Sequence, residues 1–375
     1  MKIRSAVLEA MGAEAPYANS RPLKIREVEL KPPGPGEILV RIAAAGLCHS
    51  DLSVINGDRP RPMPMALGHE AAGVVEEVGP LVDDLAKGDH VVLVFMPSCG
   101  SCLPCAEGRP ALCEKGVVSN TAGTLLSGER RIFTSDGEPV NHHMGCSAFS
   151  ERAVVSRRSA VKVPKDLPLD EAALFGCAVL TGVGAVINTA QVKAGTTVAV
   201  VGLGGVGLAS LLGAVACGAR QVAAVDLSDE KLALAKELGA TLTVNAADPE
   251  VVDKVKKATN GGVDCAIEMA GSTRAFETAY RITRRGGTTV TAGLPHPNAT
   301  WPMPATHLVA EERTIKGSYI GTCVPQRDLP RYIELYRAGK LPVNKLMTGR
   351  LTLDQINEGF DLLHEGKAVR QVVTF

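Results

Sequence analysis

Two groups of residues in this 375-residue chain have the types and spacing of metal ligands. The first group, C-x2-C-x2-C-x7-C, lies in a glycine- and proline-rich stretch and consists of Cys99, Cys102, Cys105 and Cys113. Four thiolates at this spacing can complete a tetrahedral zinc site, with no position left for a substrate. A four-iron, four-sulfur cluster begins with the same C-x2-C-x2-C, but its fourth cysteine follows after three residues and precedes a proline. We therefore predict a structural zinc ion, with an iron–sulfur cluster and unligated thiols as alternatives.

The second group is dispersed along the chain: Cys48 in GLCHSD, His69 in GHE and Cys177 in GC. An isolated cysteine is usually a small core residue, and an isolated histidine is usually a structural polar group. Taken together, two thiolates and one imidazole can hold a catalytic zinc ion whose fourth position stays open for a substrate oxygen. Asp51 and Glu70 are the carboxylates that would keep these ligands in place, one of them through the free N–H of the His69 ring.

The sequence from 202 to 207, GLGGVG, matches the dinucleotide-binding pattern G-x-G-x-x-G. It follows an apolar run at 197–201 and begins a helical stretch of small residues, so the backbone can approach a pyrophosphate at a helix N-terminus. Asp226 ends the next apolar run, where its carboxylate can bind an adenosine ribose and repel a 2′-phosphate. We predict NAD rather than NADP, although Lys231 nearby could weaken the exclusion. The predicted contacts within the loop are Gly202, Gly204, Gly205, Val206 and Gly207.

The composition argues against polyanionic partners. Forty basic and forty acidic residues balance, and no run of like charge could follow nucleic acid or an anionic membrane. Ten cysteines without an N-terminal signal segment indicate a reducing compartment, and we expect a cytoplasmic protein. The uncharged stretch 194–219 is long enough to cross a bilayer, but its glycine cluster favours a buried strand, turn and helix.

These candidate residues require two kinds of scaffold. Up to about residue 180, short apolar runs separated by turn residues predict short strands, at 38–45, 72–78 and 90–95. From about residue 195, strands alternate with helices, which predicts a doubly wound parallel sheet. The expected elements there are strands at 197–201, 222–226, 265–269 and 288–292 and a helix at 230–238; helices at 328–338 and 353–365 and a strand at 370–375 follow. We predict a mostly-β domain, 1–178 with 322–375, and an α/β domain, 179–321.

Over nearly its whole length the sequence resembles the zinc-containing medium-chain alcohol dehydrogenases, and among them the liver-type and glutathione-dependent formaldehyde dehydrogenase branch. The resemblance implies a GroES-like catalytic domain, a Rossmann domain, two zinc ions and NAD-dependent interconversion of an alcohol and its aldehyde or ketone. The long segment between Cys113 and Phe149 implies a homodimer. The motifs that carry the resemblance are GLCHSD at 46–51, GHEAAG at 68–73, the four-cysteine segment, GC at 176–177, GLGGVG at 202–207 and INEGFDLL at 356–363.

The resemblance also implies roles for individual residues. Ser50 corresponds to the start of a proton relay that contacts the substrate oxygen and the nicotinamide ribose. His49 and Arg370 correspond to cations that bind the pyrophosphate, and Lys231 to a lysine near the adenosine ribose. The residues expected to line or approach the alcohol pocket are Phe95, Arg59, Val118, His143 and Leu294, the last of which would also contact the coenzyme.

Two positions depart from the family's pattern. Ser53 stands where the relay often ends in a histidine, so the proton must leave through another group or water. Val117 stands where the glutathione-dependent branch has an arginine, which disfavours glutathione adducts as substrates. The alternatives are a glutathione-dependent formaldehyde dehydrogenase, an aldehyde reductase, and a non-enzymatic dinucleotide-binding scaffold or redox sensor. Few aromatic residues suggest a roomy aliphatic pocket, whereas His143 and Arg59 would suit a polar or acidic group.

Overall fold

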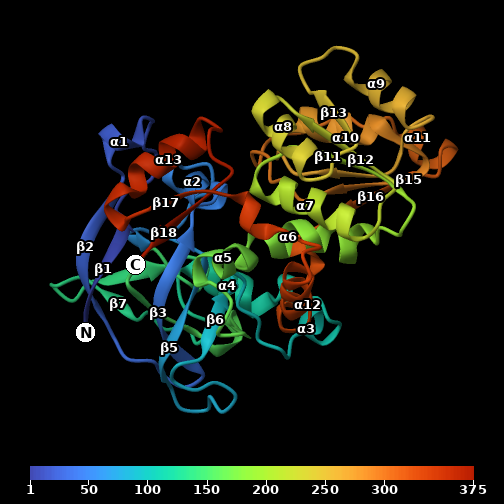
Figure 1. Ribbon diagram of the computed structural model, residues 1–375. Helices are drawn as coiled ribbons and strands as arrows, with labels where there is room; N and C mark the ends of the chain where they lie inside the picture. Colours follow the sequence, from blue (N-terminus) through green and yellow to red (C-terminus); the bar gives the residue numbers. More distant parts are fainter. The chain divides into compact units, whose positions relative to one another are not determined.

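The computed structural model describes residues 1–375, which form two compact units (Figure 1). Unit 1 comprises Met1–Cys177, Val324–Leu329 and Met347–Phe375, and unit 2 comprises Ala178–Cys323 and Pro330–Leu346. Helix α12 (Pro325–Arg337) therefore begins in unit 1 and ends in unit 2. The division differs from the expected one mainly at 330–346, which packs with unit 2.

Unit 1 consists of a small closed barrel and a larger, mostly antiparallel sheet. The barrel has the order β1 (Lys2–Leu8), β2 (Leu23–Leu30), β7 (Ile132–Phe133), β8 (Pro139–His142) and β4 (Met65–Ala66). The larger sheet has the order β10 (Ala160–Val163), β6 (His90–Leu93), β5 (Glu70–Val78), β3 (Glu37–Gly46), β18 (Arg370–Thr374) and β17 (Met347–Leu351), and β9 (Arg152–Ser156) also pairs with β3. The predicted strands at 38–45, 72–78, 90–95 and 370–375 are confirmed.

The ends of three strands in the larger sheet bring distant parts of unit 1 together. Strand β3 ends at Gly46, whose partners are Glu70 at the start of β5 and Val372 in β18. A side chain at position 46 would place its Cβ 2.7 Å from Oε1 of Glu70, so the glycine leaves room for this buried carboxylate. The segments around residues 48, 69 and 370 consequently meet at one edge of the sheet.

The helices of unit 1 are short and lie in the connections between strands. One of them, α13 (Ile356–His364), follows a 3-10 turn at Leu353–Gln355 whose capping box joins Thr352 and Gln355. Together these two elements account for the helix predicted at 353–365. The remaining helices of unit 1 are α1 (Tyr17–Ser20), α2 (His49–Ile55), α3 (Leu103–Ala106), α4 (Glu114–Ala122) and α5 (Leu169–Ala173).

Unit 2 is built on a wholly parallel six-stranded sheet, as predicted. Its order is β13 (Leu242–Asn245), β12 (Gln221–Asp226), β11 (Thr197–Val201), β14 (Val263–Glu268), β15 (Thr283–Thr291) and β16 (Thr314–Gly317). The chain starts in the middle at β11, winds outward through β12 and β13, and then returns to β14. This reversal between β11 and β14 is the topological switch point of a doubly wound sheet, the place where such folds bind ligands.

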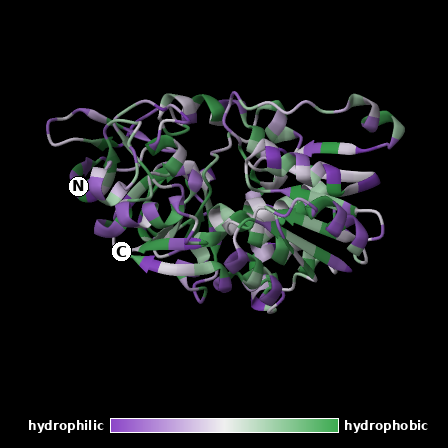
Figure 2. Ribbon diagram, turned by 90° about the horizontal axis from the view of Figure 1, so that it is seen from above, coloured by the Kyte–Doolittle hydropathy of each residue, from purple (hydrophilic) through white to green (hydrophobic).

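The sheet of unit 2 has apolar side chains on its strands, and helices pack against it. The inner strands are largely hydrophobic in Figure 2, and Ala199, Val201, Ala223 and Val225 belong to one buried cluster. Such two-sided burial explains why these strands are continuous apolar runs rather than alternating patterns. The helices of unit 2 are α6 (Ala178–Gly184), a π-helical segment (Ala185–Ala190), α7 (Gly205–Ala216), α8 (Asp229–Glu237), α9 (Val251–Ala258), α10 (Thr273–Ile282) and α11 (Ala305–Ala310).

None of the individual helices has both the length and the apolar composition needed to cross a membrane. One bent pair, Leu169–Gly176 with Ala178–Ala190, meets the length and composition criteria when its two members are taken together.

Candidate active site

Cys48, His69 and Cys177 meet in the interior of unit 1, where their potential ligand atoms all lie within 4.8 Å of one another. Cys48 precedes α2, His69 lies immediately before β5, and Cys177 follows the 3-10 turn Leu174–Gly176. The structure thus brings Cys177 together with two residues that precede it by more than a hundred positions in the sequence.

The histidine of this triad has one nitrogen engaged and one available. Nδ1 of His69 lies 3.1 Å from Oδ1 of Asp51, which also accepts the backbone N–H of Gly68 at 3.2 Å. Because the carboxylate can hold a proton on Nδ1, a neutral ring presents its lone pair on Nε2, which is buried and makes no hydrogen bond of normal geometry. An unpartnered imidazole nitrogen beside two buried thiols is a donor set that fits zinc.

The charges around the triad also favour a bound cation. A hydrogen bond with the Cys177 thiol holds the pKa of Cys48 well below its usual value, and the pKa of Cys177 rises in turn. Burial raises the pKa of the Glu70 carboxyl to about 7, although the Arg370 guanidinium opposes this by favouring the charged form. Nη1 of Arg370 lies 3.5 Å from Glu70 Oε2 and donates to the carbonyl of Leu47 at 3.0 Å. If both sulfurs are thiolates and Glu70 is ionised, one guanidinium would not balance their three negative charges, whereas a divalent cation beside them would.

Two rings pack edge-on against His69. The ring centroids of Phe95 and His143 lie 5.2 and 5.5 Å from that of His69. His143 is fully buried, burial lowers its pKa, and Nδ1 lies 3.2 Å from Asp51 Oδ1. The predicted pocket residues Phe95 and His143 are therefore beside the triad. The contact of His143 with Asp51 was not predicted, because nothing in the sequence relates the two positions.

The other predicted residues of unit 1 lie around helices α2 and α4. His49 is exposed and Ser50 half-buried at the start of α2, and the hydroxyl of Ser53 donates to the carbonyl of His49 at 2.8 Å. Arg59 is half-buried just after α2. Val118 is 68% exposed on α4, and no contact places it beside the triad.

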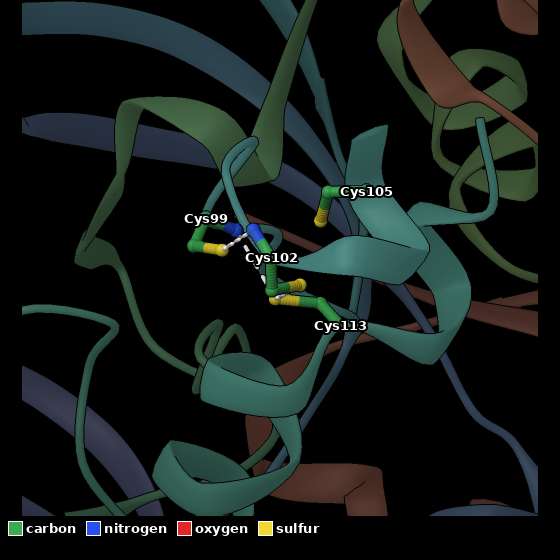
Figure 3. Close-up of side chains that lie close together, drawn as sticks. All are labelled: Cys99, Cys102, Cys105 and Cys113. Atoms are coloured by element: carbon green, nitrogen blue, oxygen red, sulfur yellow. Dashed lines mark hydrogen bonds between the residues drawn. The ribbon is translucent and has the colours of Figure 1, made fainter. Parts of the chain in front are cut away.

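The four-cysteine group forms a separate cluster (Figure 3), whose sulfurs lie within 4.8 Å of one another. Backbone N–H groups of Ser101 and Cys102 donate to the sulfur of Cys99 at 3.4 and 3.3 Å, and those of Cys99 and Gly116 donate to the sulfur of Cys113 at 3.2 and 3.3 Å. Such N–H donors stabilise thiolates.

The pKa values of two of these thiols, Cys99 and Cys105, are shifted in opposite directions. The hydrogen bonds from Ser101 lower the pKa of Cys99 to about 5, whereas burial raises that of Cys105 to about 12. A metal ion among the four sulfurs would make all of them thiolates, since metal ligation deprotonates a coordinating thiol outright. The donor set therefore fits a structural zinc ion.

The glycine-rich loop and Asp226 lie together at the carboxyl ends of β11 and β12 in unit 2. Gly202 has φ +93°, and a Cβ on it would lie 2.6 Å from the backbone nitrogen of Ala270. Asp226 accepts the backbone N–H of Leu203 at 2.6 Å through Oδ2 and that of Ser228 at 2.9 Å through Oδ1. The carboxylate is thereby fixed against the loop, and its remaining lone pairs can accept further hydrogen bonds.

Other predicted coenzyme contacts in unit 2 are placed as follows. Helix α7 begins at Gly205, so Gly205, Val206 and Gly207 form its first turn, next to Gly204. The backbone N–H of Lys231 donates to the Ser228 hydroxyl at 3.3 Å, which caps α8. Leu294 is 55% exposed beyond the end of β15.

Comparison with known proteins gives full-length matches. The family model of the alcohol dehydrogenase GroES-like domain matches residues 34–165, and that of the zinc-binding dehydrogenase matches 205–338. A Mycobacterium tuberculosis protein named "Putative alcohol dehydrogenase D" is 40% identical, with 100% of both chains covered. The fold assigned from the sequence, a GroES-like domain with a Rossmann domain, is confirmed.

Solved structures agree with these matches. A zinc-binding-domain alcohol dehydrogenase protein from Burkholderia ambifaria is 35% identical, with a TM-score of 0.94, and covers 100% of this chain and 99% of its own. Benzyl alcohol dehydrogenase from Acinetobacter calcoaceticus is 32% identical, with a TM-score of 0.93 and the same coverage. A more distant zinc-binding dehydrogenase from Sinorhizobium meliloti, 26% identical with a TM-score of 0.80 and 100% of both chains covered, is bound to NADP.

Proposed function

We propose that this chain, which belongs to the zinc-binding medium-chain alcohol dehydrogenase family and is a zinc-dependent alcohol dehydrogenase, holds its catalytic zinc ion with Cys48, His69 and Cys177 and uses NAD. The observation that carries the proposal is the unpartnered Nε2 of His69 between two buried thiols. A second zinc ion belongs to the four-cysteine cluster. NADH formation by the purified protein with a panel of primary, secondary, aromatic and hydroxy-acid alcohols tests the activity.

Zinc and NAD would each supply one part of the chemistry. Zinc, when bound, acts as a Lewis acid that makes a hydroxyl group more acidic. NAD, when bound, would supply the hydride acceptor. The protein's residues do the rest: Asp51 keeps the proton on Nδ1 of His69, Ser50 Oγ is assigned to take the proton that the alcohol gives up, and Arg370 offsets the negative charge of Glu70 and the thiolates.

We assign the substrate to the benzylic or similarly flat primary alcohols. The Phe95 ring, which packs edge-on against His69, supports this class because it places an aromatic side chain beside the triad. The relative named benzyl alcohol dehydrogenase supports it as well. Within the family, we place the chain in the liver-type branch rather than the glutathione-dependent one, since Val117 is exposed and uncharged. Stimulation of formaldehyde oxidation by glutathione would contradict that placement.

The coenzyme preference depends on Asp226. We expect Asp226→Ala to lower the ratio of kcat/KM for NAD to that for NADP by about tenfold or more, because the change removes both a charged acceptor for the ribose and the repulsion of a 2′-phosphate. Steady-state kinetics with both coenzymes measure the ratio. Asp229→Ala, a change of an exposed acid in the first turn of α8, serves as the control. An unchanged ratio in Asp226→Ala would remove the residue from the coenzyme site.

We expect the proton released by the alcohol to pass to water or to a buffer molecule, because no histidine stands at position 53. The Ser53 hydroxyl donates to the carbonyl of His49 within α2, so it does not replace the imidazole base that the family resemblance implies for this position. We expect kcat of the wild type to rise with buffer concentration and that of Ser53→His to respond much less. Initial rates at constant ionic strength and increasing imidazole concentration test this. The same slope in both proteins would eliminate this explanation.

We further propose a homodimer in a reducing compartment. Strand β16 pairs only with β15, so its outer edge carries unpaired backbone groups that a second copy could satisfy through two-fold pairing. None of the ten cysteines forms a disulfide, which supports a reducing compartment. Light scattering should give twice the chain mass of 39.2 kDa, and a change of Ile315 in β16 to proline should give the monomer mass. A monomeric wild type would contradict the proposal.

A further inference from the structure

Glu268 is a buried acidic residue at the switch point of the parallel sheet. It is the last residue of β14 and pairs with Val201, the last residue of β11. Only 1% of its surface is exposed, and no basic side chain forms an ion pair with it. A buried carboxylate without a counter-ion is costly unless its oxygens are well hydrogen-bonded.

The oxygens of Glu268 join two loops. Oε1 accepts the backbone N–H of Gly271, in the turn after β14, at 2.6 Å. Oε2 accepts the hydroxyl of Thr291, at the end of β15, at 2.7 Å. Its own backbone carbonyl accepts N–H groups of the second loop, those of Ala292 at 3.0 Å and Gly293 at 3.3 Å. One residue therefore fixes both loops at this edge of the sheet.

The two loops also touch each other and the glycine-rich loop. A Cβ on Gly271 would lie 3.0 Å from the backbone nitrogen of Leu294. A Cβ on Gly202 would lie 2.6 Å from the backbone nitrogen of Ala270, and the N–H of Met269 donates to the carbonyl of Val201 at 2.8 Å. Because the three backbone segments are so close, a shift of residues 269–271 would be transmitted to the phosphate-binding turn.

The loops 269–271 and 291–294 lie on the side of the sheet that would receive the nicotinamide half of the coenzyme. A doubly wound sheet binds a dinucleotide across the switch point, with one mononucleotide half on each side. Asp226, at the end of β12, assigns the adenosine half to the β12 side. The strands on the other side are β14 and β15, and the loops that follow them are the two that Glu268 joins.

We propose that Glu268 is a positioning residue that holds the loops 269–271 and 291–294 in the arrangement that receives the nicotinamide half of the coenzyme. This inference rests on the proposed NAD-dependent function. It predicts an effect confined to ligands that contain the nicotinamide half, which a general loss of stability would not produce.

The test compares NAD with AMP, which contains only the adenosine half. We expect Glu268→Gln, which keeps the shape but cannot accept both hydrogen bonds, to raise the Kd of NAD about tenfold and to leave the Kd of AMP within about twofold. Thr291→Val removes only the hydroxyl that Glu268 accepts and should act in the same direction. Thr291→Ser keeps the hydroxyl and should bind both ligands like the wild type. Calorimetric titration of the purified zinc-loaded protein gives all of these constants.

The outcomes separate this inference from the proposed function. If Glu268→Gln and Thr291→Val weaken NAD and AMP equally, or weaken neither, the positioning role is wrong. If Glu268→Gln fails to fold, the pair of Thr291 variants decides the question in the same way. A wild type that binds neither ligand would contradict the proposed coenzyme site itself.

Discussion

Cys48→Ser should lower kcat by at least about a thousandfold and remove one zinc ion per chain. Serine is a poor zinc ligand, and two remaining protein ligands do not make a stable site. Because Cys48 precedes α2 in an extended conformation without capping that helix through its side chain, the backbone has no need of the thiol. Alcohol oxidation with NAD and zinc analysis after dialysis measure the two effects.

The matched control for this variant is Cys217→Ser. Cys217 lies at the end of α7 in unit 2 and belongs to neither of the two cysteine clusters. The Cys217→Ser variant should keep the wild-type kcat and zinc content. Equal far-UV circular dichroism and AMP affinity in the two variants would show that the fold and the coenzyme site are retained. Full activity of Cys48→Ser would overturn the ligand assignment.

Cys113→Ser should produce the largest loss of stability. Cys113 is fully buried, its sulfur accepts two backbone N–H groups, and it caps α4. Structural zinc contributes on the order of 10 kcal/mol to small zinc domains, so the loss of one of four ligands should cost several kcal/mol in the free energy of unfolding. Denaturant unfolding followed by circular dichroism, together with limited proteolysis of residues 99–113, measures the effect.

Cys217→Ser is again the control. A second control is the wild-type protein from which a strong chelator has removed the metal ion. If a metal ion holds the segment, the wild type treated with a strong chelator should become as sensitive to protease between 99 and 113 as Cys113→Ser. A variant that unfolds at the wild-type denaturant concentration would mean that the four sulfurs do not hold a structural ion.

Local sequence patterns were sufficient to predict most of the fold. The apolar runs at 197–201 and 222–226 correspond to β11 and β12, because strands buried on both faces need no polar alternation. The GLGGVG motif identified the turn between β11 and α7, since Gly202 requires its positive φ and lies against Ala270. Residues 330–346 could not be assigned from sequence, because an amphipathic helix does not indicate which unit it will pack against.

The candidate site was only partly predictable for a related reason. Cysteine and histidine at Cys48, His69 and Cys177 are uncommon enough to be noticed even when far apart in the sequence. The contacts of His143 with Asp51, and of Glu268 with Thr291, join ordinary residue types through tertiary packing. No spacing rule connects them, so only the three-dimensional structure brings them into view.

Zinc X-ray absorption on the wild type and on Cys48→Ser tests the central assignment most directly. The wild type should contain two zinc ions per chain, with sulfur neighbours at about 2.3 Å and a smaller contribution of nitrogen or oxygen at about 2.0 Å. In Cys48→Ser, one zinc ion should remain, and its spectrum should be that of four sulfur ligands alone. Two zinc ions in the variant, or a nitrogen contribution that persists on a single remaining ion, would contradict the assignment of the catalytic zinc to Cys48, His69 and Cys177.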